Sequence, residues 1–288
     1  MDSSESWLLF YGVAGVSVIG GYLDSRGSSR TALLVQRDCL QSLTIYGSKD
    51  ELIQNFISTN AKLYHIVVHT CTNVTLQGVR IYAPENSPNT DGVHVQNSID
   101  VGVLNTIIKT GDDCILIGPG TKNLQILRVA CGPGHGIRKY CGCFETATSF
   151  DKLHYGNWNA SLVSAYFLSV NTGSTGSLGK EFEDGVENVT VKIAVFKGTQ
   201  NGLRIKSWGR PSNGFARGIV FKQVLMNNVQ NPVVIDQNYR PRSSGCPSQN
   251  SDIKISHVMY TDIKGTSASQ VAMKFDCSAT SPCNWIGL

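Results

Sequence analysis

Three aspartates in two short motifs are the side chains of this sequence that could most readily do chemistry. Asp91 lies in Asn-Thr-Asp-Gly, while Asp112 and Asp113 lie in Gly-Asp-Asp-Cys, and Asp113 follows Asp91 by 22 residues. Carboxylates that are brought close together repel one another, so the pKa of at least one is expected to rise and that group can hold a proton. Glycoside hydrolysis needs one protonated and one ionised carboxyl group. The three aspartates are therefore candidates for the acid and the base of such a reaction.

Two cations and a histidine extend this set. Arg204 and Lys206 are two residues apart on an expected strand, so both side chains point to the same face. The guanidinium is a planar fork that matches a carboxylate, which suits an anionic substrate. His135, in Gly-Pro-Gly-His-Gly, follows Asp113 by another 22 residues.

Each of these motifs also has a purely structural interpretation. Asp and Asn before Gly are ordinary turn residues. The adjacent pair Asp112 and Asp113 could bind calcium. Arg204 and Lys206 could belong to a solvated face. The functional interpretation is favoured because the motifs recur at a spacing that matches the repeat described next.

A short pattern repeats along the chain and predicts the elements that position these residues. It consists of a polar residue, an aliphatic residue, any residue, a second aliphatic residue, and three positions later a small aliphatic residue. The first aliphatic positions are Val74, Val101, Leu124, Val189, Ile219 and Ile253. Four of the five intervals between neighbours have the length of a solenoid repeat, and the alternation predicts one strand per repeat. The leucine framework of a leucine-rich repeat is missing, so we expect a parallel β-helix whose coils stack at about 4.8 Å.

Composition is consistent with an all-β chain. Of 288 residues, 41% are hydrophobic and only 16% are charged, with 29 glycines, which argues against a helical bundle and against disorder. The net charge of +4 comes without a run of basic residues, so nucleic acid is not expected as a partner. No apolar stretch has the length that a membrane-spanning helix needs, about 18 residues or more, so no such span is expected. The segment 7–21 is apolar but short and lacks a basic flank, and we expect it not to act as a signal peptide.

Nine cysteines and three glycosylation sequons suggest an oxidising compartment. The sequons begin at Asn73, Asn159 and Asn188.

The motifs together resemble those of the plant polygalacturonase family. That family carries Asn-Thr-Asp, Gly-Asp-Asp, Gly-His-Gly and Arg-Ile-Lys in this order, and here they begin at Asn89, Gly111, Gly134 and Arg204. Their flanks also match, in SPNTDGVHVQ, TGDDCILIGPGT, VACGPGHGI, GTQNGLRIKSWGRPS and NPVVIDQNY. The resemblance covers nearly the whole chain and is greatest to the exopolygalacturonases of pollen.

The resemblance implies a fold, a reaction and a set of roles. The fold would be a single right-handed parallel β-helix domain over residues 1–288. The chain would hydrolyse the α-1,4 bonds of de-esterified pectin by inversion, with exo action favoured over endo action, and without a metal or another cofactor. Asp112 would be the general acid, Asp91 and Asp113 would activate water, and His135 would assist the acid. Substrate would be bound by Asn89, Arg204, Lys206 and Tyr239. Pectin would be the partner, the protein a monomer, and the location the secreted space and the cell wall.

The sequence departs from the family at several places. Residues 138–173 are an insertion of 36 residues without the repeat pattern, and we interpret them as a retained intron in the gene. Together with its flank the insertion offers a set of Cys and His residues that resembles a zinc site, namely Cys131, His135, Cys141, Cys143 and His154. The resemblance assigns His135 to catalysis, and Cys131 is expected to pair with Cys114, one coil away, which argues against zinc. It also implies a disulfide between Cys277 and Cys283.

The two ends of the chain and one cysteine position also depart from the family pattern. Both ends are expected to be truncated within a coil. Arg240 stands where plant members have a cysteine, which would leave Cys246 without its partner.

Two functions of different classes follow. The first is an active pectin hydrolase, favoured by the intact set of catalytic motifs. The second is a catalytically impaired β-helix that binds oligogalacturonate or serves structurally, favoured by the insertion and the two ends.

Overall fold

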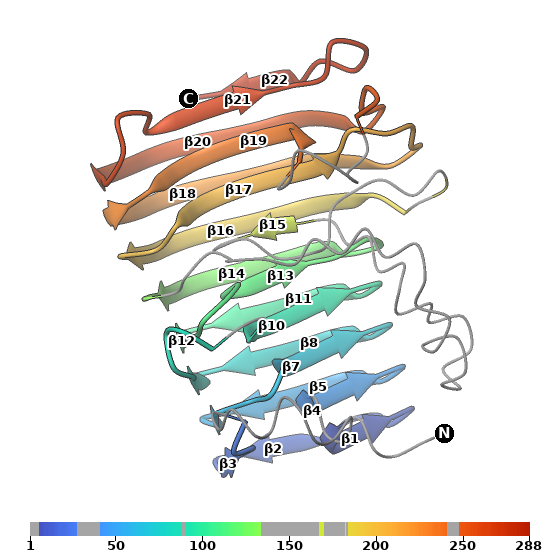
Figure 1. The fold of residues 1–288 in the computed structure, drawn as a ribbon. Coiled ribbons are helices and arrows are strands. Elements are labelled where there is room, and N and C mark those ends of the chain that lie inside the picture. Colours follow the sequence, from blue (N-terminus) through green and yellow to red (C-terminus); the bar gives the residue numbers. More distant parts are fainter. Residues whose placement is uncertain are drawn as a thin grey trace.

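A computed structural model describes residues 6–27, 41–87, 90–133, 167–169, 182, 184–240 and 248–288. Within these ranges the regular elements are all strands, and they form a stack of coils with β1–β3 at one end and β20–β22 at the other (Figure 1). Neighbouring coils pair in parallel with one exception, described below. The predicted all-β, right-handed parallel β-helix is confirmed.

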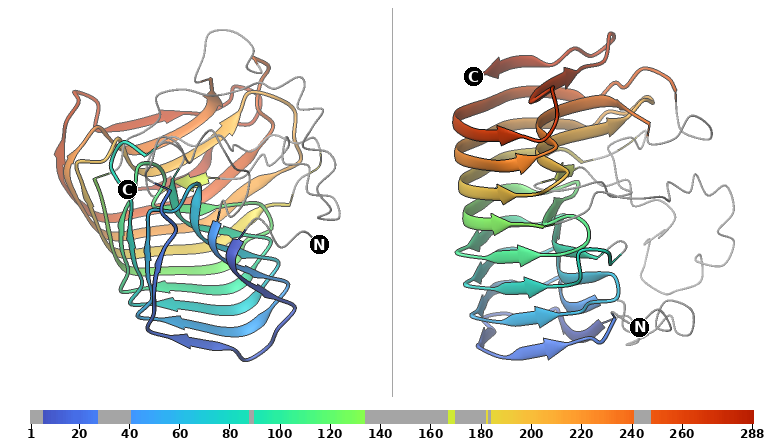
Figure 2. Two further views of the ribbon diagram at one scale, coloured as in Figure 1. Left: turned by 60° about the horizontal axis from the view of Figure 1, so that its bottom comes forward. Right: turned by 60° about the vertical axis from the view of Figure 1, so that its left-hand side comes forward.

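The coils have three walls, which the left view of Figure 2 shows obliquely from one end. The first wall consists of two sheets. One contains β1 (Ser6–Tyr11), β4 (Gln41–Tyr46), β7 (Tyr64–His69), β10 (Asp91–Gln96) and β13 (Ile115–Ile117). The other contains β15 (Phe167–Ser169), β17 (Asn201–Trp208), β19 (Asn231–Tyr239) and β21 (Met273–Asp276), and β15 lies beside β13.

The second and third walls share one large sheet. The second wall begins with β2 (Ser17–Ile19), β5 (Lys49–Gln54), β8 (Thr72–Gln77) and β11 (Ile99–Leu104). The third begins with β3 (Tyr22–Asp24), β6 (Ile57–Thr59), β9 (Arg80–Tyr82) and β12 (Ile107–Lys109). Both β11 and β12 pair with the long strand β14 (Lys122–Cys131), and beyond it each coil has one long strand across both walls. These are β16 (Val186–Lys197), β18 (Phe215–Val229) and β20 (Lys254–Ser267), followed by β22 (Asn284–Gly287).

The core consists of the aliphatic positions of the repeat, stacked coil upon coil. Val74 pairs in register with Val101, which pairs with Leu124, and the row continues through Val189 and Ile219. All five side chains are buried. Burying apolar side chains of this size stabilises the fold by about 1.5–3 kcal/mol each. The first five predicted repeats are therefore in the register that the sequence indicates.

The sixth predicted repeat is wrong by five residues. Ile219 pairs with Val258 and not with Ile253, and the residue before Val258, His257, has the positive φ of a coil corner. The row continues to Ile286 of β22, which confirms that the last residues open another repeat.

A ladder of polar side chains explains the polar residue that begins each repeat. Asp50, Asn73, Asp100, Asn123 and Asn188 all have φ between 55° and 59°. Asn and Asp adopt this left-handed conformation more readily than other non-glycine residues. Their side chains are also linked: the Nδ2 of Asn73 donates to Asp50 at 2.8 Å and that of Asn123 to Asp100 at 2.9 Å. The polar residue thus turns the chain between the first and second walls.

One coil of the first wall is built differently. In chain order, β15 fills the place between β13 and β17, but it runs antiparallel to β17, with Ser169 opposite Arg204 and Phe167 opposite Lys206. It is contributed by the surplus residues 138–173, of which the structure describes only 167–169. The described ranges contain no helix with the length and apolar character that crossing a membrane requires.

Candidate active site

Backbone contacts between adjacent coils bring the two aspartate motifs together. Asp91 is the first residue of β10, and Asp112 and Asp113 precede β13. The amide of Gly92 donates to the carbonyl of Asp113 at 2.7 Å, and the amide of Asp112 donates to the carbonyl of Thr90 at 3.3 Å. The sequence spacing between the two motifs therefore corresponds to one coil, as predicted.

The glycines of these motifs permit the close approach. A Cβ atom at Gly92 would lie 2.5 Å from the backbone oxygen of Cys114, and one at Gly111 would lie 1.9 Å from the backbone oxygen of Ser87. Both distances are too short for any side chain. Asn-Thr-Asp-Gly and Gly-Asp-Asp are therefore packing motifs as well as carriers of carboxylates, and their turn-like composition does not reduce them to turns.

The three carboxyl groups are almost fully buried. Their exposed fractions are 2% for Asp91, 1% for Asp112 and 0% for Asp113. Burial is the main cause that raises the pKa of Asp112 well above its ordinary value, and the charges of Asp91 and Asp113 raise it further, while Lys206 opposes the shift. A carboxyl group in this state keeps its proton at mildly acidic pH and can act as an acid.

Two residues that were not singled out from the sequence join the aspartates. The Nε2 atom of His94 lies 2.5 Å from Oδ2 of Asp91, and the centre of its ring lies 3.9 Å from that of Tyr64. Burial first, and then the charges of the aspartates, raise the pKa of the Tyr64 phenol. Tyr64 pairs with Asp91 across β7 and β10, so coil spacing was the available signal for Tyr64, and proximity in sequence was the signal for His94. We refer to Tyr64, Asp91, His94, Asp112 and Asp113 as the carboxylate cluster.

The predicted cations lie in the same wall, on β17. Lys206 is fully buried and Arg204 is 8% exposed, so the interpretation as a solvated face is wrong. Both charges lie over the ring of Tyr239 on β19. The distance to the ring centre is 4.5 Å from Nζ of Lys206 and 4.8 Å from Cζ of Arg204. Arg204 also forms an ion pair with Asp236 at 3.6 Å. These four residues, Arg204, Lys206, Asp236 and Tyr239, form the cation cluster.

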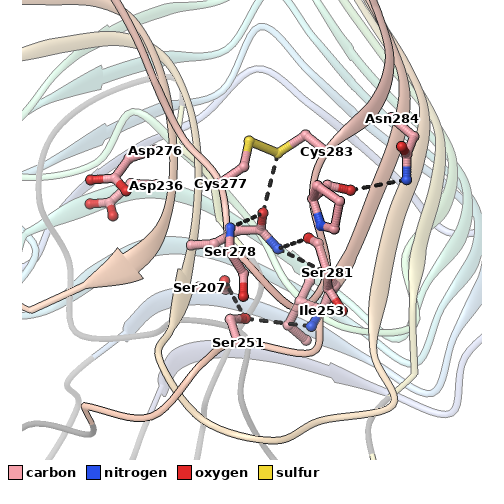
Figure 3. Close-up of a disulfide and its surroundings, with 12 residues drawn as sticks. Ser207, Asp236, Ser251, Ile253, Asp276, Cys277, Ser278, Ser281, Cys283 and Asn284 are labelled. Atoms are coloured by element: carbon pink, nitrogen blue, oxygen red, sulfur yellow. Dashed lines mark hydrogen bonds between the residues drawn. A yellow bond between two sulfur atoms is a disulfide. The ribbon is translucent and has the colours of Figure 1, made fainter.

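A buried glutamine fixes the strand that carries half of the cation cluster. Gln237 donates to the carbonyl of Ile253 at 2.7 Å and of Ser281 at 3.2 Å, and accepts from the amide of Ser278 at 2.9 Å. It thereby ties β19 to the loop closed by the disulfide Cys277–Cys283, whose predicted pairing is confirmed (Figure 3). On the other face of the neighbouring strands β19 and β21, Asp236 and Asp276 lie close together (Figure 3). Burial raises the pKa of Asp236, and Asp276 adds to this while Arg204 opposes it.

Some expected site residues lie outside the part of the chain that the structure describes. Asn89, His135, Cys141, Cys143 and His154 lie outside the described residues, so the positions of two proposed site residues and of most of the zinc-like set are not described. Within the described part of the chain, no group of three or more potential ligands is arranged to hold a metal ion.

The predicted disulfide between Cys114 and Cys131 is not formed. The two side chains are in hydrogen-bond contact, and burial raises the pKa of the Cys131 thiol, which favours its protonated form.

Comparison with known proteins gives a consistent result. The model of the family described as "Glycosyl hydrolases family 28" matches residues 2–138 and 157–287. A polygalacturonase of Prunus persica is 47% identical over all of this chain and 66% of its own length, and an exopolygalacturonase of Platanus acerifolia is 36% identical over 98% and 67%. The chain thus spans about two thirds of the length of these relatives. Among solved structures, an endo-xylogalacturonan hydrolase from Aspergillus tubingensis superposes with a TM-score of 0.73 at 18% identity, over 98% of this chain and 72% of the other, and supports the fold.

Proposed function

We propose that this chain, which belongs to glycosyl hydrolase family 28, hydrolyses the α-1,4 bonds of polygalacturonate by an inverting acid–base mechanism. The observation that carries the proposal is the buried carboxylate cluster, in which burial and two neighbouring charges raise the pKa of Asp112. A pair of carboxyl groups in different protonation states is what glycoside hydrolysis requires. The names of the Prunus and Platanus relatives support polygalacturonate as the substrate.

The reaction would proceed in one displacement. Asp112 donates its proton to the glycosidic oxygen as the bond from that oxygen to the anomeric carbon breaks. Asp91 and Asp113 accept a proton from the water whose oxygen attacks the same carbon from the opposite face, which inverts its configuration. The regenerating step returns one proton from the base to solvent and one from solvent to Asp112, so the atoms and charges balance.

The cation cluster would bind the substrate. Arg204 and Lys206 supply buried positive charge for a galacturonate carboxylate, and a ring such as that of Tyr239 can pack against a sugar. Asn89 and His135 are included in the site through the family motifs, as a binding residue and as a partner of the acid. Exo action is supported by the name of the Platanus relative, and a cell-wall location and a monomeric state complete the proposal.

The strand β15 supports an alternative, in which the chain binds oligogalacturonate without cleaving it. β15 comes from the surplus residues 138–173 and runs antiparallel directly beside Arg204 and Lys206, where the other described strand neighbours are parallel.

We propose that residues 138–173 are an insertion in a single domain, encoded by a retained intron. Sequencing the transcript across this junction tests the origin, since a mature coding transcript that contains the segment would exclude an intron.

Release of reducing ends from polygalacturonate tests the function. The full chain and a version without residues 138–173 are each assayed beside their Asp112→Asn variants, with folding monitored by circular dichroism. If the full chain and the shortened chain are both active, and both Asp112→Asn variants are inactive, the result supports hydrolysis with a tolerated insertion. Activity only in the shortened version supports the site and an inhibitory insertion. Two folded but inactive versions that still bind oligogalacturonate would replace the proposal by the binding function. Proton NMR of the first-formed anomer tests inversion, and product length separates exo from endo action.

A further inference from the structure

We propose that His94 is a positioning residue of this reaction, which fixes the orientation of the Asp91 carboxylate as the base. The inference rests on the proposed function and deepens it. It assigns a role to a side chain outside the aspartate, Gly-His-Gly and Arg-Ile-Lys motifs.

The position of His94 is set from several sides. It lies within β10, where it pairs in register with Val67 of β7 and Leu116 of β13, both of which are buried. Its own side chain is 13% exposed. The Tyr64 ring, with its centre 3.9 Å away and its plane tilted by 36°, packs against the imidazole. The imidazole is therefore held by its neighbours in an orientation that directs Nε2 at Asp91.

The contact divides the two oxygens of Asp91 between two tasks. Oδ2 accepts the Nε2–H of His94, in either the neutral tautomer with that proton or the imidazolium form. Oδ1 is buried and has no hydrogen-bond partner within the described part of the chain. The contact therefore holds one oxygen of Asp91 in place and leaves Oδ1 as the oxygen that would accept the proton from the attacking water.

Asp112 lies beside this pair and differs from Asp91 in its electrostatics. Its Oδ1 atom is likewise buried without a hydrogen-bond partner among the described residues, and burial and two neighbouring charges raise its pKa. Tyr64 from β7 packs against His94, and Asp112 from the segment before β13 interacts electrostatically with Asp91, Asp113 and Lys206. The strand neighbours of His94 are a valine and a leucine, which do not titrate. His94 therefore orients Asp91, whereas His135, the partner proposed for Asp112, lies outside the described residues.

Two substitutions at His94 test this role. His94→Leu removes the donor, and His94→Gln keeps an N–H at a similar distance. We expect His94→Leu to lower kcat by about 10- to 100-fold, as for the loss of one hydrogen bond to a charged group, with KM nearly unchanged. His94→Gln should restore most of kcat.

The matched control and a second readout make the test decisive. His257→Gln changes a histidine on β20 that stacks with Trp285, away from the site, and should leave kcat and the pH profile unchanged. Independently of activity, proton NMR should show a low-field imidazole N–H signal that is lost in His94→Gln and displaced in Asp91→Asn. A His94→Leu variant that keeps the kcat of an active wild type would overturn the inference. An inactive wild type would reject the proposed function, and the absence of the N–H signal would then reject the role of His94 separately.

Discussion

The carboxylate cluster and the cation cluster lie in the same wall of the β-helix but handle buried charge in opposite ways. In the carboxylate cluster, like charges are placed together, and their burial raises the pKa of Asp112. In the cation cluster, Arg204 is paired with Asp236, and both cations lie over the Tyr239 ring. Uncompensated charge suits proton transfer, whereas compensated charge suits binding. With the roles proposed above, one wall would separate proton transfer from substrate binding along its axis.

Lys206 connects the two clusters, and its removal should have the largest effect. Its positive charge opposes the rise in the pKa of Asp112, so Lys206→Met should raise that pKa further and move the basic limb of the pH–rate profile to higher pH. Loss of a buried charged contact with the substrate should lower kcat/KM by roughly 100- to 1000-fold. Steady-state rates on polygalacturonate, followed from acidic to neutral pH, provide the measurement.

The control for Lys206 is Lys222→Met, which removes an exposed lysine from β18. It should change neither kcat/KM nor the profile. A basic limb that stays in place in Lys206→Met would show that the two clusters act independently.

Arg204 tests whether the cation cluster contributes shape as well as charge. Arg204→Lys keeps the charge and removes the planar fork, so KM should rise by roughly 10-fold while kcat changes less. The control is Arg217→Lys on β18, since Arg217 also binds a carboxylate through two nitrogens, that of Glu187, but on an exposed part of another wall. If kcat fell and KM stayed constant, Arg204 would belong functionally with the carboxylate cluster.

Much of the fold was predictable because the repeat has a strict physical cause. Each coil buries alternate aliphatic residues and turns at a residue with positive φ, so Asn73 and Val74 indicate a corner and a core position by themselves. The sixth repeat was misplaced because two polar–aliphatic pairs, Asp252-Ile253 and His257-Val258, fit the alternation equally well. Pairing with Ile219 selects the second, and this long-range contact leaves no local signal in the sequence.

The site was predictable where its members are separated by one coil, and not where they meet at a corner. Asp91 and Asp113 could be placed together from their spacing. The contact between His94 and Asp91 spans three residues at the start of a strand, where simple alternation would direct the two side chains to opposite faces. The strand β15 could not be foreseen, because three residues carry no measurable periodicity and its antiparallel direction depends on the partner strand.

The last expected effect is on stability, and it has the opposite sign from the effect on activity. Because the folded-state pKa of Asp112 is raised above its unfolded value, the folded protein binds the proton more tightly. Stability contributed by this group is therefore present below its ordinary pKa and decreases as the pH rises from there to the folded-state value. Asp112→Asn removes this cost, so its Tm should exceed that of the wild type by about 2–6 °C at neutral pH, with the difference fading near the ordinary pKa of an aspartate.

Calorimetry at both pH values measures this difference, with Asp184→Asn as the control, since Asp184 is exposed. Asp236→Asn in the cation cluster should change Tm less, because burial raises the pKa of Asp236 while the ion pair with Arg204, which the substitution removes, opposes that shift. A variant Asp112→Asn that is less stable than the wild type at neutral pH would mean that Lys206 compensates the carboxylate cluster fully. The distinction between a strained carboxylate cluster and a balanced cation cluster would then disappear.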